Sequence, residues 1–336
     1  MQKFVFLLIS TFLYTTVCLA SAWQEFSDKE QDSTAVFRPG EVWKDDNGHV
    51  INAHGGGLLY HKDTYYWYGE LRGETESKGV NVYSSKDLYH WKYQGLALQT
   101  SSDPKSDIVS GCIIERPKVI FNQKTKKYVM WFHLEMKGQG YNAARAAVAV
   151  SEKPTGPFIL VKSFRPNGHM SRDMGLFVDL DQTAYHIYSA NDNYDLRISR
   201  LTDDYLSPTV KDSLLFSKHQ EAPALFRKGD LYFLITSGCT GWAPNRASVH
   251  VSKSLFGPWE MIGDPMLGPE SRLTFGGQST YILPVQGKKD AFIFMADVWK
   301  PKDLKDSRYI WLPIGFRDNK PVIEWQDQWD LSAFEE

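Results

Sequence analysis

Five positions along the chain repeat one arrangement of residues that could carry chemistry. In each copy, a polar or ionisable residue stands at the start of a short apolar run, and a polar turn leads to a second apolar run. The clearest copy starts at Glu221, with apolar runs at 222–226 and 231–235. The five polar residues, one per copy, are His54, Glu115, Asp173, Glu221 and Gln278. Since three of them are carboxyls, the set favours acid–base chemistry.

Three carboxyls brought close together repel one another, and this repulsion raises the pKa of at least one. A carboxyl that stays protonated near neutral pH is the proton donor that a glycosidic leaving group needs. We therefore expect Glu221 to be a proton donor. Each carboxyl alone could instead form an ordinary ion pair, for example Asp173 with Arg172. The repetition of all five in register favours a shared site.

The elements that would position these residues are the hairpins of a β-propeller. Each hairpin is followed by a second pair of β-rich segments, and the units repeat at about 45–65 residues, a spacing typical of propeller blades. Helical heptads and βαβ alternation are absent. The sequence predicts an all-β, five-bladed β-propeller over about residues 52–330. Because the innermost strand of each blade faces the central channel, all five polar residues should meet there.

Two segments outside the repeats also predict local structure. Residues 42–51 favour a small hairpin with Asp46-Asn47-Gly48 as its turn. Residues 322–325, together with Trp329, are expected to close the ring by pairing with early strands.

Further polar and aromatic residues follow the inner hairpins, and we expect them to crowd the same face. They are Glu70, Tyr141, Asn191, Thr240, Trp242, Asp297 and Trp299. Carboxylates, amides, hydroxyls and indoles together suit a neutral polyhydroxy ligand, whose apolar C–H faces stack on aromatic rings. Core packing is the alternative for every aromatic residue, and we expect it for Trp67, Trp91 and Trp259. For Glu70, Thr240, Trp242 and Trp299 both interpretations stay open.

The net charge argues against some classes of ligand, and the first residues suggest where the protein is located. The 336 residues carry a formal net charge of -2, which gives no electrostatic reason to bind nucleic acid or anionic membranes. Lys3, an apolar run over 4–14 and the small residues 20–22 have the pattern of a signal peptide. No later run is long enough to span a membrane. We expect cleavage near Ala22 and release into the periplasm or the medium.

The remaining organisation is simple. A signal peptide over 1–22 would be followed by a flexible segment over 23–39, a catalytic propeller over 40–331 and a tail over 332–336. Cys112 and Cys239 could pair in an oxidising compartment or stay two small buried thiols. No cofactor is expected, and no metal ligands are assigned, because a zinc site would need ligands besides the two cysteines. The glycines at 55–57 lack the Lys and the helix of a phosphate-binding loop.

The residues also resemble a known family. Segments 52–57, 115–118, 171–174, 221–223 and 237–245 are similar to glycoside hydrolase family 43, and within it to the exo-β-1,3-galactanase branch. The resemblance extends over about residues 40–331 and implies a five-bladed propeller that hydrolyses with inversion.

The resemblance also implies roles for single residues. It assigns Glu221 as general acid, Asp173 as the group that raises its pKa and orients it, Glu115 and Glu70 as sugar ligands, and Tyr141 and Thr240 as further contacts. Most members place an Asp base where this chain has Asn52-Ala53-His54. The galactanase branch shares that absence and uses a Gln, here Gln278, to hold the attacking water. The proton could leave through Gln278 as a transient imidic acid or through Glu115; both routes stay open.

These observations predict a secreted, monomeric exo-hydrolase that acts on an oligo- or polysaccharide and releases galactose from β-1,3-galactan of the arabinogalactan type. Inversion places the acid and the water-holding group about 6.5–9.5 Å apart. One alternative keeps the fold and changes the sugar, giving a β-galactofuranosidase or an α-L-arabinofuranosidase. The other is a carbohydrate-binding propeller without catalysis.

Overall fold

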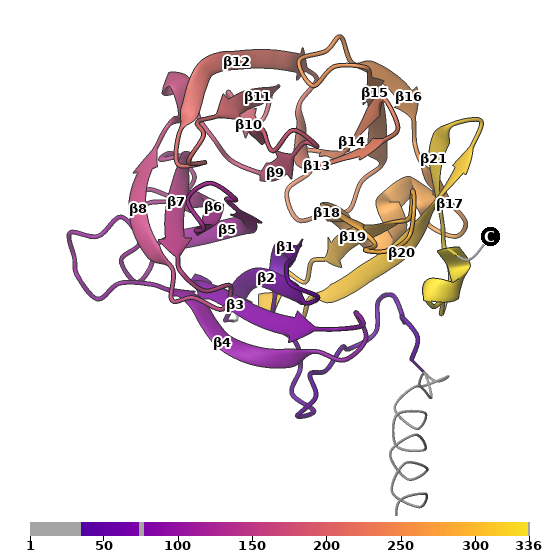
Figure 1. Cartoon of the computed structure of the whole chain (residues 1–336), viewed down its shortest axis with the longest axis horizontal. Helices are drawn as coiled ribbons and strands as arrows, with labels where there is room; N and C mark the ends of the chain where they lie inside the picture. Colours follow the sequence, from indigo (N-terminus) through magenta and orange to yellow (C-terminus); the bar gives the residue numbers. More distant parts are fainter. Residues whose placement is uncertain (1–34, 74–76, 335–336) are drawn as a thin grey trace, which may run out of the picture. The chain divides into compact units, whose positions relative to one another are not determined.

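The computed structural model describes residues 35–73 and 77–334. The expected signal peptide at 1–22 lies outside the described residues, as does most of the segment 23–39. The unit that begins at Phe37 is a five-bladed β-propeller (Figure 1). Among the described residues, no helix is long and apolar enough to cross a membrane.

Four of the blades are four-stranded antiparallel sheets whose strand order follows the chain. The first contains β1 (His54–Tyr60), β2 (Tyr65–Arg72), β3 (Ser77–Ser85) and β4 (Lys92–Gln99), and the second β5 (Ile113–Phe121), β6 (Tyr128–Glu135), β7 (Arg145–Ser151) and β8 (Ile159–Phe164). The third contains β9 (Met174–Val178), β10 (Ala184–Ala190), β11 (Asp195–Leu201) and β12 (Pro208–Ser217), and the fourth β13 (Gln220–Lys228), β14 (Leu231–Gly238), β15 (Ala247–Ser252) and β16 (Glu260–Gly263).

The fifth blade has an additional short strand at its outer edge. It contains β17 (Met266–Leu267), β18 (Gln278–Pro284), β19 (Phe292–Val298), β20 (Arg308–Arg317) and β21 (Lys320–Glu324), in the order β17-β21-β20-β19-β18. Short 3-10 helices lie in the connections: η1 (Pro166–Gly168), η2 (Ser271–Gly276), η3 (Leu304–Asp306) and η4 (Leu331–Phe334).

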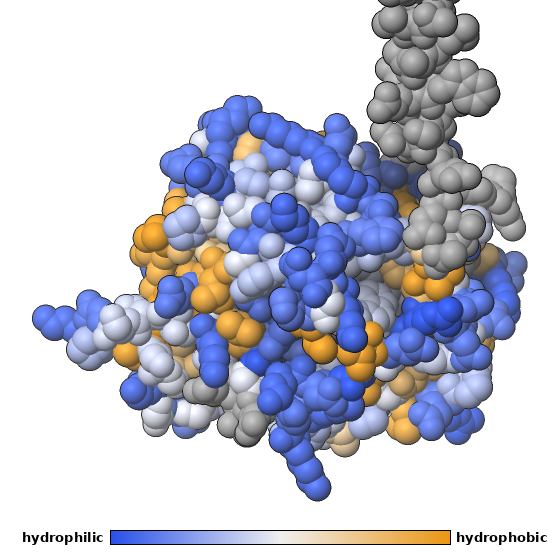
Figure 2. All heavy atoms as spheres, turned by 90° about the horizontal axis from the view of Figure 1, so that it is seen from below, coloured by the Kyte–Doolittle hydropathy of each residue, from blue (hydrophilic) through white to orange (hydrophobic). Residues whose placement is uncertain are grey.

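Burial follows the distance of a strand from the axis. The strands β1, β5, β9, β13 and β18 lie nearest the centre of the ring (Figure 1). Strand β6, one place further out, buries every residue, including His133 and Glu135 after its apolar run over 128–132. At the rim, β4 exposes most of its side chains. The side of the ring near β4 is accordingly mostly hydrophilic, with scattered apolar groups (Figure 2).

The ring closes differently from the sequence expectation. Strand β21 pairs with β20 and, in parallel, with β17, so the prediction that 322–325 pairs with early strands is wrong. Trp329 does take part in the closure, as expected, but its partner is Phe37, which lies in no strand. The backbone groups of the two residues exchange two hydrogen bonds of 2.7 and 3.1 Å. Phe37 is 3% exposed and stacks on Trp329. Phe37, which was expected in a flexible segment over 23–39, is therefore held in place by the ring closure.

Several local expectations are confirmed. Lys44 and Val50 form a bridge, which gives the small hairpin at 42–51. The Asp45 side chain accepts the amides of Asn47 and His49, each at 2.9 Å, and so fixes the turn. Trp67 and Trp91 are core residues at 1% and 2% exposure.

Candidate active site

Four of the five inner strands contain a β-bulge near the polar residue that was picked out from the sequence. The pairing register shifts between His54 and Gly57, between Glu115 and Lys118, between Glu221 and Ala224, and between Ser279 and Tyr281. A bulge re-aims side chains and is common beside active sites. In β5, β13 and β18 the polar residue near the bulge lines the pocket, whereas His54 at the bulge of β1 does not.

In three blades, the residue after the polar one adopts a left-handed conformation, and its amide binds a carboxylate from the preceding blade. Gly55, Arg116 and Ala222 have φ of 59°, 55° and 55°. Their N–H groups donate to Asp297, Glu70 and Asp173, respectively. These carboxylates therefore fix the backbone of the next blade at the site.

The inner strands surround a pocket of about 270 Å³ at one end of the channel. Of the predicted residues, Glu70, Glu115, Tyr141, Asp173, Glu221, Trp242, Gln278 and Trp299 line it. The pocket is slightly smaller than typical ligand sites of about 300–1,000 Å³. It therefore suits a single sugar ring better than a chain.

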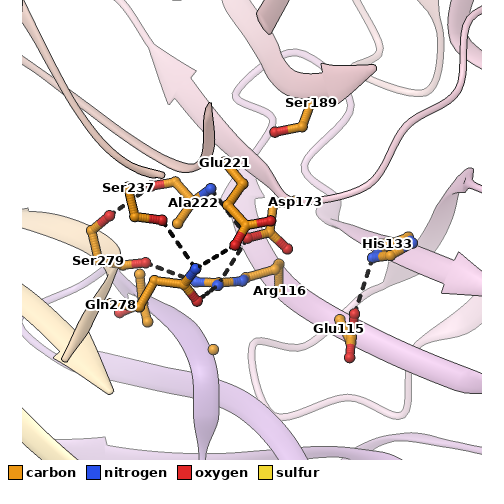
Figure 3. Close-up of polar contacts among 12 residues, drawn as sticks. Glu115, Arg116, His133, Asp173, Ser189, Glu221, Ala222, Ser237, Gln278 and Ser279 are labelled. Atoms are coloured by element: carbon orange, nitrogen blue, oxygen red, sulfur yellow. Dashed lines mark hydrogen bonds and ion pairs between the residues drawn. The ribbon is translucent and has the colours of Figure 1, made fainter. Parts of the chain in front are cut away.

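Glu221 lies on one wall of the pocket, beside Asp173, Arg116 and Gln278 (Figure 3). Burial and the nearby Asp173 carboxylate raise the pKa of Glu221 to about 7. Asn193 donates to its Oε2 at 2.9 Å, and the Cys239 thiol also contacts it. The Arg116 guanidinium lies 2.9 Å from Asp173 Oδ2 and keeps that carboxylate beside Glu221. Glu221 can therefore carry a proton at neutral pH.

Gln278 uses all four hydrogen-bonding positions of its amide within the protein. Its Nε2 donates to Glu221 Oε1 at 2.9 Å and to Ser237 Oγ at 3.0 Å. Its Oε1 accepts from Arg116 and, at 3.1 Å, from Trp299 Nε1. The expected separation of about 6.5–9.5 Å between acid and water holder is therefore wrong for this arrangement, because the two side chains bind each other directly.

Glu115 belongs to a second group of residues, away from Glu221 (Figure 3). Its Oε1 accepts from Arg72 Nη2 and from the Tyr141 hydroxyl, each at 2.8 Å. Its Oε2 lies 3.2 Å from His133 Nδ1. Although burial opposes ionisation, the His133 and Arg72 contacts hold the pKa of Glu115 well below its usual value. Glu115 is thus an ionised hydrogen-bond acceptor.

Glu70 completes this side of the pocket. Its Oε2 forms an ion pair of 2.5 Å with Arg72, and its Oε1 accepts the Arg116 amide at 2.8 Å. Burial raises its pKa, against the opposing effect of Arg72. Arg72 thus holds Glu70 and Glu115 together.

One set of atoms has the composition of a metal site. Glu115, His133 and Asp173 place ligand atoms within 4.8 Å of one another. Each of these side chains already faces an oppositely charged group, since Arg72 binds Glu115, Arg116 binds Asp173, and His133 lies between Glu115 and Glu135. The arrangement is therefore that of an ion-pair network rather than of a set of free ligands.

Four predicted ligand residues do not line the pocket. His54 is fully buried and stacks on the Tyr309 ring at 5.1 Å, and burial lowers its pKa to about 3. Asp297 is buried and accepts the Gly55 amide. Thr240 donates to the Ala243 carbonyl within its own loop.

Asn191 is the fourth predicted ligand residue that does not line the pocket. It is exposed at the end of β10, and Asn193, two residues later, reaches Glu221 instead. Its left-handed turn, with φ of 50°, 52° and 66° at 191–193, decides which Asn faces the site.

Six residues that line the pocket carried no predicted role, and most of them are basic. They are Arg72, Arg116, His133, Arg172, Asn193 and Gly241. One signal could have found His133, because it lies directly across from Glu115 in the β5–β6 pair. The two cysteines are free thiols, and Cys239 lies beside Glu221.

Known proteins share the sequence pattern and the fold of this chain. The model for glycosyl hydrolases family 43 matches residues 57–301, more than half of the chain. The chain belongs to glycoside hydrolase family 43. It is a glycoside hydrolase with the five-bladed propeller of its relatives.

Three solved family 43 structures illustrate the similarity. A β-1,3-galactosidase with galactodeoxynojirimycin is 48% identical, with a TM-score of 0.86 over 88% of this chain and 100% of that chain. An exo-β-1,3-galactanase from Phanerochaete chrysosporium with galactose is 38% identical, with a TM-score of 0.82 over 88% and 68%. One from Clostridium thermocellum is 40% identical, with a TM-score of 0.81 over 88% and 66%. No curated protein matches the chain.

Proposed function

We propose that this family 43 hydrolase is an inverting exo-enzyme that releases galactose from β-1,3-galactan of the arabinogalactan type. The observation that carries the proposal is Glu221, a buried carboxyl with a pKa of about 7 on the wall of a pocket sized for one sugar. The β-1,3-galactosidase and exo-β-1,3-galactanase activities named for similar structures support the choice of sugar and linkage.

Glu221 donates its proton to the glycosidic oxygen as the bond to C1 breaks. Asp173 disfavours the ionised form of Glu221, and Asn193 orients the carboxyl through Oε2. The terminal sugar is held by groups on the opposite wall, where Glu115, Glu70 and Arg72 offer acceptors and donors for hydroxyls.

We assign the attacking water to Gln278. When the glycosidic oxygen takes the place of Gln278 as the partner of Glu221, the Gln278 Nε2–H group becomes available to the water. Two routes can take the proton that the water loses. The ionised Glu115 carboxylate can accept it directly or through a second water. Gln278 can accept it only at Oε1, in place of the Arg116 or Trp299 hydrogen bond, while its Nε2 passes a proton to the newly ionised Glu221 and a transient imidic acid is left. A loss of kcat in Glu115→Gln would select the first route.

The test uses two substrates that differ in their need for an acid. Glu221→Ala should lose about 10²–10⁴-fold in kcat on β-1,3-galactobiose, yet retain turnover of 2,4-dinitrophenyl β-galactoside, whose leaving group needs no proton. Gln278→Ala should lose turnover of both substrates, and Glu115→Gln should mainly raise KM. Equal losses of Glu221→Ala on both substrates would reject Glu221 as the acid.

Proton NMR of the first product settles sugar and stereochemistry together. We expect α-galactose as the first anomer released. Release of β-galactose, which means retention of configuration, would overturn the inverting mechanism. Preference for aryl α-L-arabinofuranoside or aryl β-galactofuranoside over β-galactoside would overturn the choice of sugar. Measurable binding of β-1,3-galactan without release of sugar would identify a carbohydrate-binding propeller.

We also infer export and a monomeric state for the mature enzyme, in line with a polymeric substrate outside the cytoplasm. The pattern of residues 1–22 supports export. N-terminal sequencing of the mature protein should begin at Trp23, and light scattering should give the mass of one chain. A mature protein that retains residues 1–22 would contradict the first inference.

A further inference from the structure

Next to Glu115 lie two side chains that do not belong to the proposed reaction: His133, which lines the pocket, and Glu135, which does not. His133 and Glu135 lie on β6 two residues apart, so both side chains leave the same face of the strand. His133 is 1% exposed and Glu135 is 0% exposed. A buried carboxylate is costly unless it is paired and hydrogen-bonded, and Glu135 therefore needs a structural reason to be there.

The contacts of Glu135 supply that reason. Its Oε1 lies 2.8 Å from His133 Nε2, and its Oε2 accepts the Ala144 amide at 2.9 Å. On the other edge of the imidazole ring, Nδ1 faces Glu115 Oε2 at an ion-pair distance of 3.2 Å, although the two atoms do not meet the geometry of a hydrogen bond. The ring is therefore held between two carboxylates, one behind the pocket and one in its wall. An imidazole that faces an acceptor at each nitrogen is best satisfied as the doubly protonated cation.

The charges around His133 agree with this state. Besides Glu115 on β5 and Glu135 on β6, Asp173 before β9 has a ligand atom within 4.8 Å. Tyr141, whose ring centre is 6.0 Å away, donates to Glu115, and Arg72 on β2 forms an ion pair with Glu115. Although burial disfavours the charge, the contacts with Glu115 and Glu135 raise the pKa of His133 to about 9.

We propose that Glu135 and His133 are positioning residues for the sugar site: Glu135 keeps His133 as an imidazolium, and this imidazolium fixes the Glu115 carboxylate in its place in the pocket wall. Neither residue touches the reacting atoms. The inference rests on the proposed role of Glu115 as a sugar ligand. It adds that galactose affinity depends on a proton carried by His133, separately from the proton that Glu221 donates.

The experiment measures galactose binding by calorimetry as a function of pH in the Glu221→Gln variant, which removes the titration of the catalytic acid and serves as the reference protein. In this reference, Kd should stay flat up to about pH 8. When Glu135→Gln is added, which keeps the size of the side chain and removes its charge, the pKa of His133 should fall by about 1–3 units. The Kd should then be close to the reference value near pH 6 and rise about tenfold near pH 8.

A merely structural role for Glu135 would raise Kd by the same factor at every pH, and that result would overturn the proposal. So would an unchanged Kd profile. Glu152→Gln in the same reference protein is the matched control, since Glu152 is an exposed carboxylate paired with Lys127; its profile should follow the reference.

A second measurement applies even if Glu135→Gln fails to fold. In wild-type protein labelled with ¹³C-histidine, with the signal assigned by its absence in His133→Asn, the His133 ring should remain protonated to about pH 8. Titration at or below about pH 6.5, the ordinary range for histidine, would reject the imidazolium. If the wild type binds no galactose at all, the sugar assignment fails, whereas this titration still tests the Glu135–His133 pair.

Discussion

Glu221 can act as the acid only while it carries a proton. The pH–rate profile of the enzyme should therefore have a basic limb, in which activity falls as the pH rises. Burial and Asp173 raise its pKa to about 7, so the carboxyl is mostly protonated below that pH and mostly ionised above it. We expect kcat/KM on β-1,3-galactobiose to fall about tenfold for each pH unit above about 7. Initial rates across the pH range check this, and a flat profile to about pH 9 would contradict it.

Cys239 affects the pH at which this basic limb begins. Its thiol stays protonated, since burial and the adjacent Glu221 raise its pKa to about 12, and its contact with Glu221 lowers the pKa of the carboxyl. Cys239→Ala removes the contact, so the basic limb should move to higher pH by about half to one unit. The control is Cys112→Ala, at a buried position in the core beside β5, which should leave the limb unchanged.

At the scale of elements, the bulge of β1 depends on a glycine. Gly55 has φ of 59°, and a Cβ there would lie 2.2 Å from Glu70 Oε1 and 3.5 Å from the Arg116 amide nitrogen. Its N–H binds Asp297, and its carbonyl accepts from Lys118 Nζ at 2.9 Å. Since the backbone is held on both sides, the collision has to displace Glu70.

We therefore expect Gly55→Ala to lose sugar affinity as well as stability. Gly48 is the matched control, because its φ of 80° imposes a similar strain while no atom lies within 4 Å of its Cβ position. Gly48→Ala should cost about 1 kcal/mol of stability with activity intact. Calorimetric binding of galactose and urea unfolding of both variants separate the two effects. Equal activity of the two variants would contradict the role of Gly55.

The bulges also explain what the sequence could predict at the site. Glu115, Asp173, Glu221 and Gln278 were identified because each stands at the start of an apolar run, a signal that survives in the sequence. Arg116 was missed because strict alternation would point it away from Glu115. Its φ of 55° breaks that alternation, so both side chains line the pocket. A left-handed residue other than glycine leaves no such signal.

At the scale of the whole molecule, stability depends on the contact that closes the ring. Phe37 stacks on Trp329, and its ring also lies 5.9 Å from Trp311 in the same aromatic cluster. Phe37→Ala should cost about 3–5 kcal/mol of unfolding free energy while leaving kcat at 25 °C unchanged, because no pocket residue is touched. Urea unfolding checks this. Val210→Ala, at a residue 98% exposed, should have no measurable effect.

The number of blades and the identity of their inner strands were predictable because each blade repeats the same local pattern. The closure was predicted only in part, since Trp329 was expected in it and Phe37 was not. It consists of a two-residue bridge between Phe37 and Trp329, at opposite ends of the propeller sequence, and neither residue stands in an alternating run that marks a strand. Pairing between such distant segments is decided by the geometry of the finished ring, so no short stretch of sequence carries it.

The carboxylates that bind the left-handed amides have a consequence for building chimeras from related hydrolases. Glu70 of the first blade holds Arg116 of the second, and Asp297 of the fifth holds Gly55 of the first. A crossover at a blade boundary would separate each carboxylate from the backbone it shapes. Crossovers in the turns between β1 and β2 and between β5 and β6 keep Glu70 together with Arg116. The transferable module of this fold is therefore the junction between blades.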